Sequence, residues 1–517
     1  MVCVGTEGRS GERTAIARVW WSMVTFDGLI PESATYPGQA TSLARFPMLL
    51  RGGLMARRLA GAWLLVLALV GLARGQATTT TTTTTAQQAG VVIDAEGVLK
   101  VRLVTDRGGL LARRRVEEAL SRLPVDIARA SKLRKVSLHR LEAALKDRLE
   151  AGDTATDEML HLAGLTRVSH VFYYPDSHDI VIAGPAEAWA EDPAGRTRGV
   201  ESGRPTILLS DLVVALRAFP PQGTPTPLVS CSIDPTKEGL ANMQEFLKTL
   251  PNRLGGQPTA STARFIADGL QRSLGLQVVT IQGIPDNTHF AQVLVEADYR
   301  MKLIGIGLEK PPVKLKSYVD LANPSSVAAN AMQRWYFTPN YSCVRATEDG
   351  WAMELEGEGV KLIGADELVA ADGTRVAAGR EDAAGKLFVQ GFTDKYPELA
   401  RTVPIYAQLR NCIDLLVAAA FIQKEDYYGQ AGWTMPVLSS EDGFAVQTAP
   451  AAKRVDSAVA TVLKGNRLMT PIGGGVNIQA RRALSPEHLL TDDEGKVAAA
   501  RAAVSVSGLT PSQWWWD

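Results

Sequence analysis

The stretch that decides the fold class runs from Val168 to Ile182 and reads VSHVFYYPDSHDIVI. Two β-branched and aromatic runs, Val168–Tyr174 and Ile180–Ile182, flank the segment Pro175–Asp179, whose residues favour turns. This pattern predicts a β-hairpin. Leucines at helical spacing precede it, so helices and strands share one region of the chain. The sequence therefore predicts an α+β fold with short mixed sheets.

Upstream of the hairpin we expect a strand pair and two helices. Val91–Arg102 contains two β-branched runs that read as strands, and residues 111–122 place three apolar side chains near one helix face. Ser137 stands where a helix N-cap is expected, and Gly152 is expected to end that helix. The apolar stripe between these two residues consists of Leu138, Leu141, Leu145 and Leu149.

Downstream, the apolar run Leu228–Ile233 predicts a strand, and Asp234-Pro235 is a favourable helix start. A second helix is expected over 259–274, followed by the strand Val278–Ile281. This order forms a β-α-α-β unit, which is compatible with parallel pairing of the two strands.

Phe290–Leu308 fits both a strand and a helix, and two charge pairs favour the helix. Glu296–Arg300 and Asp298–Lys302 each place an acid four residues before a base, the favourable orientation on a helix.

Residues 334–369 read as short strands resembling a meander, and Pro404–Lys424 as a long helix. Arg410 and Asp414 argue against that helix spanning a membrane. Residues 430–480 return to short strands, with Gly473–Gly475 expected as a turn.

We divide the chain by these signals and by Pro220–Pro227, a segment rich in proline that marks a boundary. The expected regions are a disordered leader from an over-extended gene model (1–54), a signal peptide (55–77), a threonine-rich linker (78–90), an N-terminal α+β domain (91–220), a second α+β domain (228–395) and a C-terminal region (396–517). The C-terminal region is expected to be a long helix with a β-rich extension.

The signal peptide is read from three adjoining parts. Arg57-Arg58 form a basic head, Leu59–Ala73 is an uncharged apolar run of 15 residues, and small residues lead to Ala77. We expect cleavage after Ala77, while a retained N-terminal anchor is the alternative. Because about 20 apolar residues are needed to cross a bilayer, the run is short for a span. The sequence thus predicts export to the periplasm, cell surface or exterior, with no transmembrane helix after cleavage.

Composition bounds the partners of the exported chain. The full sequence holds 55 basic and 55 acidic residues; removal of residues 1–77 leaves 47 and 51, a net charge of −4. The region 106–148 is basic but contains no Phe, Tyr or Trp, so we expect a solvated helical face rather than a nucleic-acid surface. An anionic wall polymer or lipid surface is the alternative.

Cysteines and histidines show no spacing typical of a metal site or another cofactor site, so we expect none. The mature chain keeps Cys231, Cys343 and Cys412, which leaves open one disulfide with a free thiol or three small buried side chains. Cys231 precedes a predicted helix and could act as a nucleophile with His289 as base; a structural role is the simpler interpretation.

Two further features have a functional and a structural interpretation. Glu296 and Asp298 could form an acid–base pair, but the ion pairs with Arg300 and Lys302 explain the same residues. Trp514–Trp516 could bind a partner groove or fold back on the chain's own surface.

The runs Val171–Trp189 and Gly203–Arg217 resemble a family of exported planctomycete proteins that contain a domain of unknown function, number 1598. The domain is expected over about 110–220, with a looser likeness in Val295–Lys302 and Gln333–Phe337. The resemblance implies export and carries over no catalytic residue. We expect an exported envelope or surface protein that acts by binding or structure; an exported hydrolase without a local motif is the alternative. Its partner is not identified by the sequence.

Overall fold

The computed structural model is described here over most of the chain that follows the predicted threonine-rich linker. The predicted leader, signal peptide and nearly all of that linker lie outside the described residues, as does much of the helix expected after Asp234-Pro235. The structure describes residues 88–236, 238–239, 242, 245–246, 249–250, 259–322, 334–364, 367–369, 375–377, 383–459, 474–504, 506, 508–510 and 512–517.

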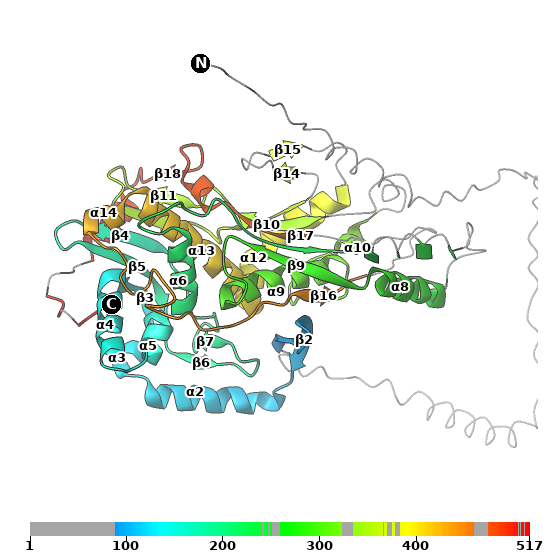
Figure 1. Ribbon diagram of the computed structural model, residues 1–517, viewed down its shortest axis with the longest axis horizontal. Helices are drawn as coiled ribbons and strands as arrows, with labels where there is room; N and C mark the ends of the chain where they lie inside the picture. Colours follow the sequence, from blue (N-terminus) through cyan, green and yellow to red (C-terminus); the bar gives the residue numbers. More distant parts are fainter. Residues whose placement is uncertain are drawn as a thin grey trace, which may run out of the picture. The chain divides into compact units, whose positions relative to one another are not determined.

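The described strands form two large mixed sheets (Figure 1). In the eight-stranded sheet, β10–β17 and β2–β16 are parallel and the other neighbours antiparallel. Its order is β1 (Gln88–Ile93), β2 (Val98–Val104), β16 (Arg454–Asp456), β9 (Leu276–Gln282), β8 (Val229–Asp234), β17 (Gly474–Ile478), β10 (Trp335–Pro339) and β13 (Val360–Gly364).

The seven-stranded sheet contains the predicted hairpin as β4 and β5. Its order is β18 (Leu490–Thr491), β11 (Val344–Ala346), β12 (Ala352–Leu355), β4 (His170–Tyr174), β5 (Asp179–Ala186), β3 (Ser131–Ser137) and β19 (Trp515–Trp516). The hairpin is buried on both faces, because Ile180 and Ile182 enter the main core while Phe172 and Val181 enter a second cluster. Burial on both faces explains its continuous apolar sequence.

Two small hairpins and the helices complete the described elements. The hairpins are β6 (Trp189–Glu191) with β7 (Thr197–Gly199), and β14 (Glu367–Val369) with β15 (Arg375–Ala377). The helices are α2 (Leu110–Arg122), α3 (Val125–Ala128), α4 (Leu138–Glu150), α5 (Asp157–Leu160), α6 (Leu209–Ala218), α8 (Ala260–Leu274), α9 (His289–Gly305), α10 (Tyr318–Leu321), α12 (Ala383–Thr402), α13 (Pro404–Lys424), α14 (Tyr427–Ala431) and α15 (Lys496–Ala502), with short 3-10 turns at Arg107–Gly109, Leu162–Gly164 and Ala480–Leu484.

Helix α13 is the centre of the helical layer. It packs against α6, α9 and α12, while α9 also covers β8 and β17 of the eight-stranded sheet. Among the described helices, α13 is the one long and apolar enough to cross a membrane, yet its apolar window is wholly buried in this fold. Burial on all sides is typical of a core helix.

The α+β prediction is confirmed, and several elements match their predicted positions. Ser137 caps α4 by accepting a hydrogen bond from the Arg140 backbone N–H, and Thr259 caps α8 in the same way. The ambiguous segment Phe290–Leu308 is helical as α9. These elements have strong local signals, since a cap and an apolar stripe act within one or two turns.

Three predicted connections differ from the structure. β8 and β9 pair antiparallel rather than parallel. The strands after Arg334 do not form one meander, because β10 and β13 join one sheet while β11 and β12 join the other. Each sheet also takes strands from all three expected regions, 91–220, 228–395 and 396–517, so the proposed boundaries run through both sheets.

Gly474 and Gly475 lie in the strand β17, not in a turn. Gly474 has a φ of +149°, and a Cβ there would lie 2.3 Å from the Trp335 carbonyl oxygen. A Cβ on Gly475 would lie 2.2 Å from the Cys231 carbonyl oxygen. The glycines are therefore required by close approach of neighbouring strands, a common reason for glycine inside a sheet.

The tryptophan tail folds back on the chain. Trp515 and Trp516 pair with β3, and Trp514 and Trp516 are buried. The guanidinium of the fully buried Arg134 lies over the Trp515 ring and bonds both side-chain oxygens of Asp517 at 2.9 Å. Self-packing, one of the two predicted alternatives, is what the structure has.

Candidate functional site

The first residue of α9, His289, meets Asp211 in the first turn of α6. Thr288 caps α9 through its hydroxyl and thereby sets the helix start. His289 Nδ1 lies 2.8 Å from Asp211 Oδ2, and the imidazole keeps 23% of its surface exposed. Burial alone would lower the pKa of His289, but the carboxylate of Asp211 outweighs it and raises that pKa.

Gln408 on α13 orders the protons of this pair. Its Oε1 accepts a hydrogen bond from Arg196 Nη1, so its Nε2 is the donor toward His289 Nε2, 3.2 Å away. His289 then carries its proton on Nδ1 and donates it to Asp211. A proton on His289 Nε2 would make this N–H face the N–H of Gln408, so that two donors meet without an acceptor. Charging this histidine therefore requires the Gln408 amide to turn.

Arg196 extends the chain of contacts to a second acid. Its Nη2 lies 2.5 Å from Glu296 Oε1, and Arg300 approaches the same oxygen at 3.6 Å. Arg300 also bonds Glu309 at 2.6 Å. Burial opposes the charge of Arg300, but the hydrogen bond that Arg300 donates to Glu309 raises the pKa of Arg300 overall. We call the six residues Arg196, Asp211, His289, Glu296, Arg300 and Gln408 the α9 network.

The second predicted pair, Asp298 and Lys302, also forms, with Nζ 2.8 Å from Oδ2. Asp298 is fully buried, and burial raises its pKa despite the nearby ammonium. A Cβ on Gly474 would lie 2.8 Å from Lys302 Cε, so this pair packs directly under β17. Glu296 and Asp298 thus have separate basic partners and do not form an acid–base pair.

Cys231 does not have the environment of a nucleophile. It lies inside β8 opposite Val476, and burial raises the pKa of its thiol well above the ordinary value. His289, its suggested base, is engaged by Asp211 and Gln408. The structural interpretation of Cys231 therefore holds, and the nucleophile interpretation is wrong.

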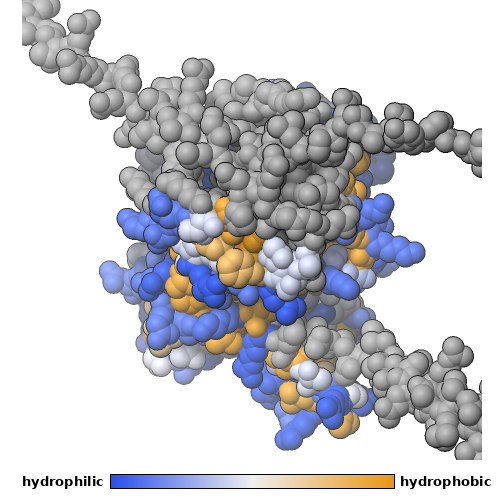
Figure 2. All heavy atoms as spheres, turned by 90° about the vertical axis from the view of Figure 1, so that its right-hand side faces the viewer, coloured by the Kyte–Doolittle hydropathy of each residue, from blue (hydrophilic) through white to orange (hydrophobic). Residues whose placement is uncertain are grey.

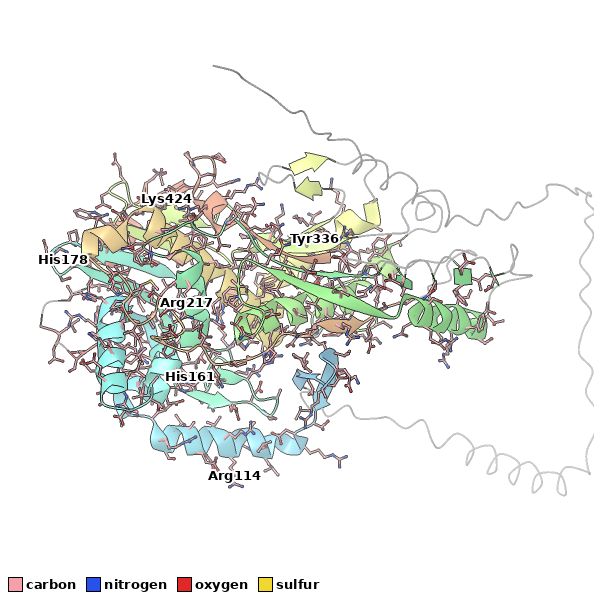
Figure 3. All side chains as sticks on the ribbon, viewed as in Figure 1. Arg114, His161, His178, Arg217, Tyr336 and Lys424 are labelled. Carbon is pink, nitrogen blue, oxygen red and sulfur yellow. The ribbon has the colours of Figure 1, made fainter. Side chains whose placement is uncertain are left out.

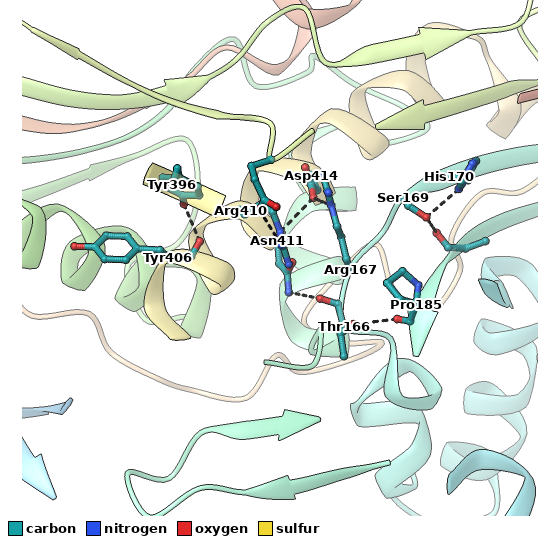
Figure 4. A network of polar contacts seen from close by, with 12 residues as sticks. Thr166, Arg167, Ser169, His170, Pro185, Tyr396, Tyr406, Arg410, Asn411 and Asp414 are labelled. Carbon is teal, nitrogen blue, oxygen red and sulfur yellow. Dashed lines mark hydrogen bonds and ion pairs between the residues drawn. The ribbon is translucent and has the colours of Figure 1, made fainter. Parts of the chain in front are cut away.

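A second buried network surrounds Asp414 (Figure 4). Arg167 Nε lies 2.8 Å from Asp414 Oδ2, and Arg410 bonds Glu358 at 3.0 Å. Asn411 donates to the Thr166 carbonyl oxygen at 3.1 Å. The contacts of Asp414 and Asn411 tie α13 to the segment that enters β4, and the contact of Arg410 ties it to the loop between β12 and β13. The two charges that argue against α13 as a membrane span are therefore paired inside the fold.

Three histidines that are near one another in sequence, His161, His170 and His178, do not meet at one site. The His161 ring lies beside the Trp189 ring, His178 lies exposed in the β4–β5 turn, and these two labelled residues lie well apart in Figure 3. Burial, with a smaller effect of Arg167, lowers the pKa of His170 to about 4. Within the described residues, no three His, Cys, Asp or Glu side chains are placed to hold a metal ion.

Two surface hollows in the described part of the chain lie away from the α9 network. One lies between β9 and residues 451–453, and the other where the end of α8 meets β16. Neither is lined by His289, Asp211 or Glu296.

Three members of the α9 network were not singled out from the sequence: Arg196, Asp211 and Gln408. Asp211 and His289 are 78 residues apart, and Arg196 and Gln408 are 212 apart. No local spacing marks such pairs. The one available signal is Asp211 at the start of an apolar run that forms α6, and a favourable charge at a helix N-terminus explains this acid equally well.

Comparison with known proteins identifies part of the chain. The model of a family described as "Protein of unknown function (DUF1598)" matches residues 231–318. The match lies downstream of the expected 110–220 and covers β8 from Cys231 onward together with α8, β9 and α9. Searches of curated proteins and of solved structures found no match. Residues 231–318, with His289, Glu296, Asp298, Arg300 and Lys302, are thus similar to a domain of unknown function.

Proposed function

We propose that the protein is exported and acts at the cell envelope or surface by binding. The signal-like segment 55–77, the threonine run that follows and the resemblance to exported planctomycete proteins support export. The observation that carries binding is the surface of α2. Ala119 is the one buried residue of this helix, while Leu110 is 69% and Leu111 42% exposed.

The exposure of α2 differs from the buried stripe expected over residues 111–122. Leu120, at its far end, is also 46% exposed. Arginines accompany the leucines, and the labelled Arg114 points away from the helix in Figure 3. Its Nε lies 2.8 Å from Oε1 of Glu118. A helix that exposes leucines beside arginines is suited to contact an apolar and anionic envelope component.

Export and binding are tested separately. N-terminal sequencing of the native protein is expected to begin at Thr78, and a start within residues 1–54 would overturn the signal assignment. For binding, envelope fractions are washed with salt and the retained protein is measured. The variant Leu110→Ser/Leu111→Ser/Leu120→Ser is expected to be lost from the fraction. The control Leu160→Ser changes a leucine of 40% exposure on α5 and is expected to be retained.

A second candidate, an exported hydrolase, is supported by the partly exposed His289 with its carboxylate partner. A histidine oriented by Asp211 can act as a general base once the amide of Gln408 turns away from Nε2. Turnover of ester, peptide or glycoside substrates that disappears in Asp211→Asn and His289→Gln, with both variants folded, would favour it. Turnover that persists in both would exclude this site.

A further inference from the structure

Strand β1 forms an open edge of the eight-stranded sheet. It pairs with β2 without a bulge, with Gln88 opposite Val104 at one end and Ile93 opposite Leu99 at the other. No other described strand lies beside it. The turn between them is fixed, since Asp94 Oδ1 accepts from the Val98 backbone N–H at 2.9 Å and Gly97 has a φ of +76°. The turn therefore fixes the register of β1 on β2.

The direction of its free backbone groups follows from the ladder. The Asp94 N–H donates to the Val98 carbonyl oxygen at 3.1 Å, so these two residues are a hydrogen-bonded pair. Such pairs alternate along an antiparallel ladder. The backbone groups of Ala89, Val91 and Ile93 consequently point away from β2, and none of them has a partner in the described part of the chain.

Edge strands usually carry charges, proline or a bulge, or are very short. The edges of the other sheet, β18 and β19, have two residues each. β1 has six, and its sequence QAGVVI contains neither charge nor proline. The apolar side chains of Val92 and Val101 are 43% and 38% exposed beside this edge. Figure 2 shows hydrophobic residues interspersed with hydrophilic ones on the face that forms the right-hand side of Figure 1.

We infer that β1 is an interface between two copies of this chain, formed by antiparallel pairing of β1 with β1. The outward backbone groups of Ala89, Val91 and Ile93 set the register of this pairing. The twofold axis passes between the two copies of Val91, and Ala89 of each copy lies opposite Ile93 of the other. No like charges meet, because β1 is uncharged and the nearest acid, Asp94, pairs with Lys100 of its own copy at 2.8 Å. Because the pairing consumes both edges, it closes as a dimer.

The dimer is weak on its own. One six-residue strand per copy buries less than the roughly 1,000 Å² typical of a stable interface. Exposed Val92, Val101 and Leu110 lie next to the edge along the chain and add apolar area. We expect a dimer that forms with rising concentration and dissociates on dilution.

Sedimentation velocity of the full chain over a wide concentration range tests the interface. Wild type is expected to form dimers. Val91→Pro removes an outward N–H that does not bond to β2, so the β1–β2 hairpin is expected to remain. The dissociation constant of the dimer is expected to rise about tenfold or more. An unchanged melting temperature shows that the variant is folded. A wild type that stays monomeric at every concentration, or a Val91→Pro chain that dimerises equally well, overturns the inference.

Thiol cross-linking gives an independent test. Cys231, Cys343 and Cys412 are buried and unpaired, so they contribute little background. Val92→Cys with a short bis-maleimide is expected to give a covalent dimer, since the two residues flank the axis. Leu160→Cys, of similar exposure on α5, is the control and is expected to stay monomeric. Equal cross-linking of both variants would contradict the β1 interface.

Discussion

The imidazole Nδ1 of His289 lies 2.8 Å from Oδ2 of Asp211, and this contact joins α9 to α6 across 78 residues of sequence. Gln408 on α13 holds the other nitrogen of the ring. Three helices of the buried layer therefore meet at one side chain whose pKa is raised. The stability of this junction depends on pH.

Asp211→Asn is expected to lower the pKa of His289. A raised histidine pKa contributes stability that is present below its ordinary value of about 6.5 and is lost as pH rises through the raised value. The stability difference between wild type and variant is therefore larger at acidic than at alkaline pH. NMR titration measures the pKa of His289, and urea unfolding at an acidic and an alkaline pH measures the stability difference. His139→Gln, at an exposed histidine, is the control. A difference independent of pH would contradict the linkage.

Gly474→Ala is expected to destabilise the chain by about 2–4 kcal/mol, because the added Cβ meets the Trp335 carbonyl oxygen and the backbone φ is +149°. Gly495→Ala is the matched control: its φ is +65°, but nothing lies within 4 Å of its Cβ. Only the backbone cost of about 1–2 kcal/mol applies there. Equal losses in chemical denaturation would show that strand crowding at β17 is unimportant.

Asp298→Asn is expected to cost about 3–5 kcal/mol, because it leaves the ammonium of Lys302 buried without its counter-charge. The double variant Asp298→Leu/Lys302→Met is expected to recover most of that loss, since a packed apolar pair often replaces a buried ion pair without penalty. Denaturant unfolding of all three chains forms the comparison. Lys395→Met, in an exposed pair with Glu398, is expected to change the melting temperature little. A double variant less stable than Asp298→Asn would refute the argument.

Cys231, Cys343 and Cys412 are expected to be unreactive until the protein unfolds. Each is buried, and burial raises the thiol pKa, to about 12 for Cys343. A coloured thiol reagent should label almost nothing in the native protein. After denaturation it should label three thiols if the leader is removed, and four if Cys3 is retained. Rapid native labelling, or fewer than three thiols without reductant, would contradict this prediction.

The sequence predicted local elements well, because their determinants are local. Ser137 caps α4 within one turn, and the pairs on α9 span four residues. It did not predict β3, where Lys132, Arg134 and Lys135 interrupt the apolar pattern. Arg134 is nevertheless fully buried, because five backbone or carboxylate oxygens accept hydrogen bonds from its guanidinium within 3.0 Å.

Sheet order and the α9 network depend on contacts between distant segments. Gly474 and Gly475 are typical turn residues by composition, and only the neighbouring strands reveal why they are glycines. α12 contains Pro397, which argues against a helix in sequence, and it crosses the proposed boundary at 395–396. At Gly474, Gly475 and Pro397, contacts with distant segments determine the secondary structure and override the preference of the local sequence.

Deletion of Gln513–Asp517 is expected to destabilise the chain, because the tail fills a core and completes a sheet. Trp516 packs with Phe172 and Val181 on one face of the seven-stranded sheet, and Asp517 neutralises the buried guanidinium of Arg134. Removing a buried tryptophan alone costs about 3–5 kcal/mol. Thermal unfolding should therefore begin several degrees lower in the truncated chain.

The single variants separate packing from charge. Trp516→Ala is expected to lose most of the stability that the deletion removes, whereas Thr510→Ala, at an exposed residue before the tail, is expected to behave as wild type. Asp517→Asn tests the ion pair alone and should have a smaller effect, since the backbone oxygens of Ile127, Ala163 and Arg129 still bind Arg134. A truncated chain with an unchanged melting temperature would mean that the tail does not stabilise the fold, and the partner-binding alternative for Trp514–Trp516 would then be favoured.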